Sequence, residues 1–127
     1  MIFYPTVSKS YVGPRSTLEM IYLAPVSGLL TYQVIANGIV DTFLVATAQR
    51  NQYFEGLPFA SLWTSADDRN HVSPNLLVSP GQWHLLVRNR TAAQVEVQVQ
   101  INFQPTGSNL GPTGPSGPQG GNQGPWY

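Results

Sequence analysis

The chain has no cysteine and very little charge. None of its 127 residues is a cysteine, so disulfide bonds and thiol chemistry are excluded. Charged residues make up 9% of the chain, against roughly 25% in an average soluble domain, and the six acidic and six basic residues cancel. Nucleic acids and anionic lipid surfaces are bound by clusters of lysine and arginine, which this composition does not supply. We therefore expect no nucleic-acid partner.

Long apolar runs are absent as well. No stretch approaches the roughly 20 apolar residues that a membrane-spanning helix needs. The first 16 residues lack the basic start and unbroken apolar run of a signal peptide. We expect no membrane span and no signal peptide in this chain, which was either made without a signal or had its signal removed.

The polar residues that are present are mainly uncharged. Glutamine, asparagine, serine and threonine are abundant, and no charged residue follows Glu96. Near-zero net charge gives little electrostatic protection against self-association. Amide and hydroxyl groups can hydrogen-bond to copies of the same surface without desolvating ions. The composition thus favours a protein that assembles with itself.

Proline and glycine divide the chain into three parts. Residues 1–16 are predicted to form an extended N-terminal arm, because Pro5 and Pro14 interrupt regular structure. Residues 17–104 are predicted to form one β-sandwich domain, and residues 105–127 a Gly/Pro-rich tail. Two interpretations of the arm stay open: an edge strand of the domain, or a segment that packs on a neighbouring subunit.

The central part contains short apolar segments separated by turn residues. Asn37-Gly38 predicts a tight hairpin, and Gln49–Phe54 a helical turn closed by Gly56. Ser65–Asn70 reads as an exposed loop. The segments expected to be strands are 17–23, 29–36, 39–47, 59–64, 76–78, 83–88 and 94–104.

The last of these segments gives the clearest pattern. Valines, Ile101 and Phe103 alternate with Glu96, glutamines and Asn102, a period of two that indicates a strand with one buried and one wet face. Many short strands without a long helical segment favour an all-β fold. We predict an antiparallel β-sandwich of jelly-roll type.

Several runs resemble small β-sandwich modules of bacterial secreted proteins. They are Gly38-Ile39-Val40-Asp41-Thr42-Phe43-Leu44-Val45, Tyr53-Phe54-Glu55-Gly56 and Ser79-Pro80-Gly81-Gln82-Trp83-His84-Leu85-Leu86-Val87-Arg88-Asn89. The layout is similar to the pre-peptidase C-terminal type and to GOLD domains, over residues 17–103. The resemblance implies a jelly-roll-like sandwich with an accessory or interaction role.

The tail resembles a short collagen-like segment. Gly111, Gly114, Gly117 and Gly120 recur every third residue, as in a triple helix, before the register breaks. The alternative is a polyproline-like or flexible linker of residues 105–127, which would reach about 70 Å when extended. Aromatic residues at the two chain ends are predicted to contact another subunit: Phe3, Tyr4, Trp126 and Tyr127.

Catalytic and metal-binding patterns are poorly represented. No serine lies in a Gly-x-Ser-x-Gly setting, and His84, on the opposite strand face from its neighbours, is interpreted as a surface or packing histidine. His71 shares a segment with Asp67 and Asp68, but their spacing matches neither an EF-hand nor a zinc site. We predict no catalytic residue, no metal and no cofactor.

Two features point to other partners. Trp63, Asp67 and Asp68 form a candidate site for a glycan or peptide, because an aromatic ring and acidic groups lie in neighbouring segments. Asn89-Arg90-Thr91 is a glycosylation sequon at an expected hairpin tip. An Asp41 at the start of a strand is expected to cap a turn through its side-chain oxygens.

These observations predict a non-enzymatic structural subunit. It would self-assemble into a filament, trimer or particle surface through its sandwich and terminal segments, on a virion or an extracellular surface appendage. The alternative is a carbohydrate- or peptide-binding accessory module.

Overall fold

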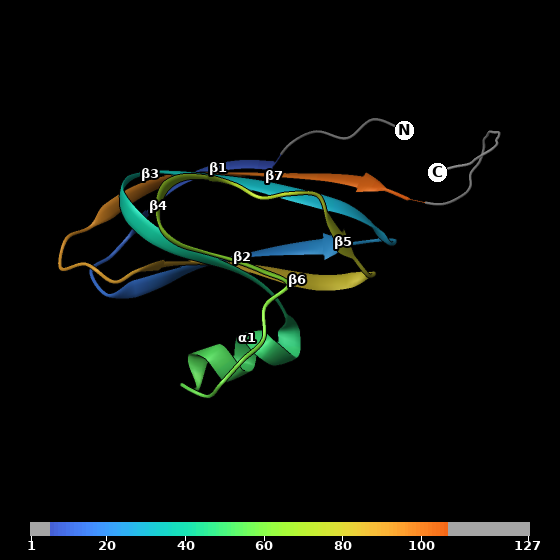
Figure 1. The fold of residues 1–127 in the computed structure, drawn as a ribbon, viewed down its shortest axis with the longest axis horizontal. Helices are drawn as coiled ribbons and strands as arrows, with labels where there is room; N and C mark the ends of the chain where they lie inside the picture. Colours follow the sequence, from blue (N-terminus) through green and yellow to red (C-terminus); the bar gives the residue numbers. More distant parts are fainter. Residues whose placement is uncertain (1–5, 107–127) are drawn as a thin grey trace.

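The computed structural model describes residues 6–106, and most of them belong to β-strands. Figure 1 shows the strands in two layers, with one helix below them. In chain order the elements are β1 (Thr6–Val12), β2 (Ser16–Ala24), β3 (Gly28–Ala46), α1 (Thr47–Phe54), β4 (Trp63–Val72), β5 (Leu76–Val78), β6 (Gly81–Asn89) and β7 (Val95–Pro105). An all-β antiparallel fold is confirmed, and the finer jelly-roll assignment stays a prediction.

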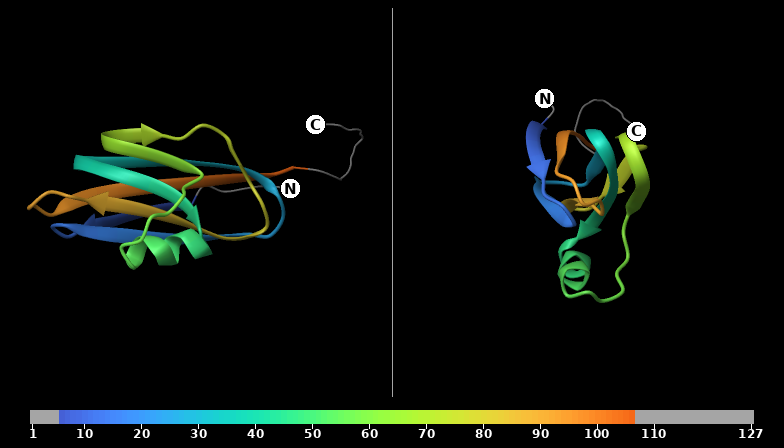
Figure 2. Two further views of the ribbon diagram at one scale, coloured as in Figure 1. Left: turned by 60° about the horizontal axis from the view of Figure 1, so that its bottom comes forward. Right: turned by 90° about the vertical axis from the view of Figure 1, so that its left-hand side faces the viewer.

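One long strand, β3, connects the two layers. Its first half, Gly28–Ala36, pairs with β7, and its second half, Asp41–Ala46, pairs with β6. The strand order is β1-β7-β3-β6-β2, with β4 and β5 on the other side of β3, and every pairing is antiparallel. We call β1, β7, β5, the first half of β3 and the end of β4 that pairs with it (Asn70–Val72) the upper layer. The lower layer is β2, β6 and the second half of β3 (Figure 2).

The predicted hairpin at Asn37-Gly38 is wrong, because the chain passes straight through it within β3. A two-residue type I′ turn needs positive φ at both positions, and neither residue has it. A Cβ on Gly38 would lie 3.1 Å from Val95, so close packing favours glycine here. The Asn37 side chain accepts a hydrogen bond from the Glu96 backbone N–H at 2.9 Å. The dipeptide therefore lies where β3 bends between layers.

The predicted loop at Ser65–Asn70 is also wrong, since these residues belong to β4. The polar, charged composition suggested a loop, but the strand pairs along β3 with two register shifts. Asp67 occupies the left-handed region, with φ 55°, at this irregularity. Residues 59–62 of another expected strand precede β4 without strand structure. Most polar residues of this segment are the exposed side chains of a strand, and not a sign of a loop.

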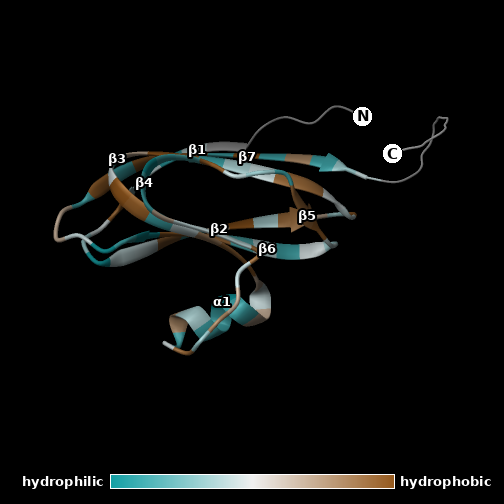
Figure 3. Cartoon of the chain, in the orientation of Figure 1, coloured by the Kyte–Doolittle hydropathy of each residue, from teal (hydrophilic) through white to brown (hydrophobic). Residues whose placement is uncertain are grey.

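Other expectations are confirmed. Along β7 the apolar residues are buried and the polar ones are half-buried or exposed, so hydrophilic and hydrophobic colours alternate in Figure 3. The expected helical turn is α1, and Gly56 ends it with φ 75° while its N–H bonds to Tyr53. Residues 6–12 of the expected arm form the edge strand β1, the first of the two interpretations.

The core lies between the layers. Its largest fully buried side chains come mainly from β3, β6 and β7 and include Leu30, Tyr32, Leu44 and Leu85. A second, smaller cluster lies on the outer side of the lower layer, where Phe43, Val45 and Leu86 pack against Tyr53 of α1 and Phe59. No helix in the described part of the chain has the length and apolarity to cross a membrane.

Candidate interaction surfaces

The three residues of the predicted ligand site belong to β4, but their polar groups are engaged within the protein. Trp63 is half-buried and its Nε1–H donates to His71 Nε2 at 3.0 Å. His71 Nδ1 lies 3.1 Å from Asp68 Oδ2. The Asp67 carboxylate points elsewhere and forms an ion pair with Arg90. The structure thus does not gather the three side chains around one open site.

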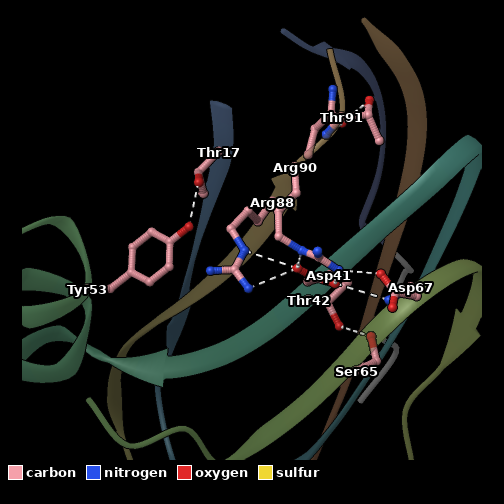
Figure 4. Close-up of polar contacts among 10 residues, drawn as sticks. Thr17, Asp41, Thr42, Tyr53, Ser65, Asp67, Arg88, Arg90 and Thr91 are labelled. Atoms are coloured by element: carbon pink, nitrogen blue, oxygen red, sulfur yellow. Dashed lines mark hydrogen bonds and ion pairs between the residues drawn. The ribbon is translucent and has the colours of Figure 1, made fainter. Parts of the chain in front are cut away.

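Asp41 is the centre of a polar cluster at the bend of β3 (Figure 4). Its carboxylate is 2% exposed and accepts hydrogen bonds from Arg88 Nε at 3.0 Å and Arg90 Nε at 2.6 Å. The backbone N–H of Asp67 donates to its Oδ1 at 3.0 Å, and the Asp67 side chain pairs with Arg90. Asp41 therefore fastens the β4 irregularity to β3. The expected turn-capping role is wrong, because Asp41 lies within β3 and not beside a hairpin.

The electrostatics of this cluster favour the charged carboxylate. Burial would raise the pKa of Asp41, but hydrogen bonds from Arg90, the Asp67 backbone and Arg88 outweigh it, and the pKa is lowered. Two arginines and two aspartates balance in charge. This arrangement holds strands together and leaves no excess charge for a ligand.

A second polar cluster joins α1 to the lower layer. His84 is 3% exposed; its Nδ1 lies 2.7 Å from Glu19 Oε2 and its Nε2 lies 2.9 Å from Thr47 Oγ1. Arg50 of α1 donates two hydrogen bonds to the same Glu19 carboxylate, at 2.7 and 3.0 Å. Hydrogen bonding from Arg50, aided by His84, lowers the pKa of Glu19.

The order carboxylate, imidazole, hydroxyl resembles that of a hydrolase triad, but Glu19 is shared with a guanidinium. A carboxylate committed to Arg50 is a weaker partner for an imidazolium. The cluster instead ties Thr47 and Arg50, at the start and middle of α1, to β6 and β2. Tyr53 adds a third tie, with its hydroxyl 2.6 Å from Thr17 Oγ1. His84 is thus a packing histidine, one of the two interpretations made from the sequence.

The glycosylation sequon is structural in this fold. Asn89 is 0% exposed, and its Nδ2 donates to the backbone carbonyls of Val12, Gly13 and Ala93. Its Oδ1 accepts from the Thr91 backbone N–H at 2.9 Å. A side-chain nitrogen with three internal partners is inaccessible to a glycosyl transferase. Asn89 instead fixes the β1–β2 turn against the β6–β7 turn.

The outer face of the upper layer has no helix over it in the described part of the chain (Figure 1). We call it the bare face. Its uncharged polar residues include six from β3 and β7: Thr31, Gln33, Gln98, Gln100, Asn102 and Gln104. Apolar residues lie among them: Tyr11, Leu29, Ile35, Val72 and Leu77. The mixture of amides and aliphatic side chains makes a broad, sheet-like surface.

Charge on the bare face is internally neutralised. Lys9 of β1 and Glu96 of β7 are its charged residues within residues 8–106, and their side chains lie 2.7 Å apart. Two shallow grooves, each of about 250 Å³, cross the face near its ends. One includes Ile35 and Gln98, and the other includes Leu29 and Asn102.

Metal binding has no support in the described residues. Between residues 6 and 106, no three His, Asp or Glu side chains are placed to hold an ion.

The predicted contact residues Phe3, Tyr4, Trp126 and Tyr127 lie outside the described residues, as do the collagen-like triplets. Sequence reasoning missed the pairing of Glu19 with His84, because the two are 65 positions apart and share no motif.

Comparisons with known proteins give a fold and no family. No family model matches the chain, and no curated protein matches it. Among solved structures, the chain is similar to PliG of Aeromonas hydrophila, a periplasmic inhibitor of g-type lysozyme, with a TM-score of 0.56. The match covers 80% of this chain and 88% of PliG at 15% sequence identity. At this identity the likeness shows the all-β fold alone, and the resemblance to pre-peptidase C-terminal and GOLD modules stays a prediction.

Proposed function

We propose that this chain is a non-enzymatic structural subunit that assembles with copies of itself. The observation that carries the proposal is the bare face, which is wide, uncovered among the described residues and neutral. Protein interfaces are depleted of charge at their centres, because a buried unpaired charge is costly. On this face the lysine and glutamate already satisfy each other.

The amide side chains suit contact between copies. An amide carries both donors and an acceptor, so a face rich in amides is complementary to itself. Gln100 stands opposite Gln33, and Asn102 opposite Thr31, in neighbouring strands. Exposed Leu77 and Val72 supply apolar area beside them. A second copy can therefore cover the face without burying an unpaired charge.

The other surface groups favour a binding role over catalysis. The carboxylates and histidines of the two polar clusters are engaged with neighbouring side chains and fasten strands and helix together. The structural neighbour is itself an inhibitor and not an enzyme. Assembly would serve a filament, trimer or particle surface at an extracellular or virion location, and the periplasmic location of the neighbour fits an exported protein. The aromatic residues of the two chain ends are proposed as additional contacts.

Charge placed on the bare face tests the proposal. The double variant Gln33→Glu/Gln100→Glu puts two carboxylates opposite each other, so association should weaken at least tenfold. The matched control Ala48→Glu/Leu57→Glu adds the same charge at exposed positions on and after α1. Light scattering over a concentration series measures the mass of each. Equal association of both variants would contradict the assignment of this face.

The alternative, a carbohydrate- or peptide-binding accessory module, is tested with a glycan array and a peptide library. Binding that is lost in Trp63→Ala but kept in the charged double variant would favour it over assembly.

A further inference from the structure

The two edges of the sheet differ in how well they are protected. β1 and β2 are the terminal strands in the order β1-β7-β3-β6-β2, and within the described residues each pairs on one side. Natural proteins protect such edges with short strands, lysine, proline or bulges, because unpaired backbone groups template pairing with another chain. β1 is seven residues long and carries Lys9.

β2 lacks each of these devices. It runs for nine residues, from Ser16 to Ala24, without proline, lysine or arginine. Its register with β6 is unbroken, so no bulge turns the edge away. Its one charged side chain, Glu19, is already held by Arg50 and His84. On its outward side Ile21 is 58% and Leu23 65% exposed.

We infer that β2 is a pairing edge for the β2 strand of a second copy, joined antiparallel across a two-fold axis. This inference rests on the proposed self-assembly and names one of its contacts. Two-fold contacts use the same surface on both partners. The strand alternates between inward Leu18, Met20 and Tyr22, which pack on the core, and outward residues, so two copies present matching faces.

Charge and apolar area select the register. Centring the pair on Glu19 would set two carboxylates directly opposite, which is destabilising. Centring it on Met20 pairs the whole strand but sets the exposed Ile21 against the carboxylate of Glu19. Centring it on Ile21 sets Ile21 against its own copy and Leu23 against Glu19, and keeps residues 18–24 paired, so the most apolar contact lies at the centre. The geometry therefore points to Ile21 as the centre. A second interface on the bare face would then extend the dimer into a larger assembly.

Single cysteines test this register, because the native chain has none. In the full-length chain, Ile21→Cys should cross-link into a covalent dimer with a short bismaleimide, since directly opposed Cβ atoms lie about 5 Å apart. Leu23→Cys is the matched control on the same edge. In this register the two Leu23 positions are offset by four residues, about 13 Å, so cross-linking should fall at least fivefold.

Three outcomes are distinguishable when light scattering accompanies the cross-linking. Assembly with preferential Ile21→Cys cross-linking supports the inference. Assembly with equal or no cross-linking at the two positions would overturn the β2 contact while leaving the proposed function intact. A chain that stays monomeric would overturn both.

Discussion

The two layers of this sandwich present opposite kinds of outer face. The lower layer is covered by α1, with a small apolar cluster and the Glu19–His84–Arg50 contacts beneath the helix. The upper layer carries amides and scattered aliphatic side chains with no described helix over them. The comparison shows that the helix-covered layer pairs Glu19 of β2 with Arg50 of α1. The layer that the helix does not cover presents a neutral surface instead.

The largest difference between the faces should appear in folding stability. Leu86 is 0% exposed beneath α1, so Leu86→Ala removes buried methyl groups and leaves a cavity. We expect a loss of about 3 kcal/mol in the free energy of unfolding. Gln100→Ala on the bare face should change it by less than about 0.5 kcal/mol. Urea unfolding of both variants measures this, and equal losses would remove the distinction between the faces.

Asn89 tests what joins the two layers at one end. Asn89→Ala takes the donor away from three backbone carbonyls of the β1–β2 and β6–β7 turns. We expect a loss of about 2 kcal/mol, because buried acceptors are left unsatisfied. Asn102→Ala, at an exposed position of the bare face, is the control. If Asn89→Ala unfolds at the same urea concentration as the control, the turns are held by other contacts.

Acid should weaken the folded domain through its carboxylate clusters. The pKa values of Asp41 and Glu19 are lowered in the folded state from ordinary values of 3.8 and 4.5. Groups of this kind stabilise the fold above their unfolded pKa, and that contribution is lost as pH falls through the lowered folded values. Melting temperature should therefore be steady above about pH 5 and fall below pH 4. Asp41→Asn should flatten this dependence; an unchanged slope would show that Asp41 does not contribute.

Local patterns in the sequence predicted the parts of the fold that depend on local physics. The alternation in β7 gave its buried face, and Gly56 gave the end of α1. The Asn37-Gly38 prediction failed because packing against Val95 and the bend of β3 override turn propensity. The polar clusters could not be predicted, because their members come from strands far apart in the chain.

The candidate surface could be predicted only in part from the sequence. Amide richness predicted self-association, but which amides share one face depends on the pairing of β3 with β7. The expected site at Trp63, Asp67 and Asp68 followed proximity along the chain. In the structure Asp67 turns toward Arg90, while Asp68 turns toward His71.

The mass of the full-length chain in solution tests the central claim most directly. Light scattering across a wide concentration range should give a mass that rises from one chain, 13.9 kDa, to two and more. The rise should persist between pH 6 and 8, because the contact surfaces are neutral. A mass of one chain at every concentration would contradict the claim that these uncovered surfaces bind copies of the protein.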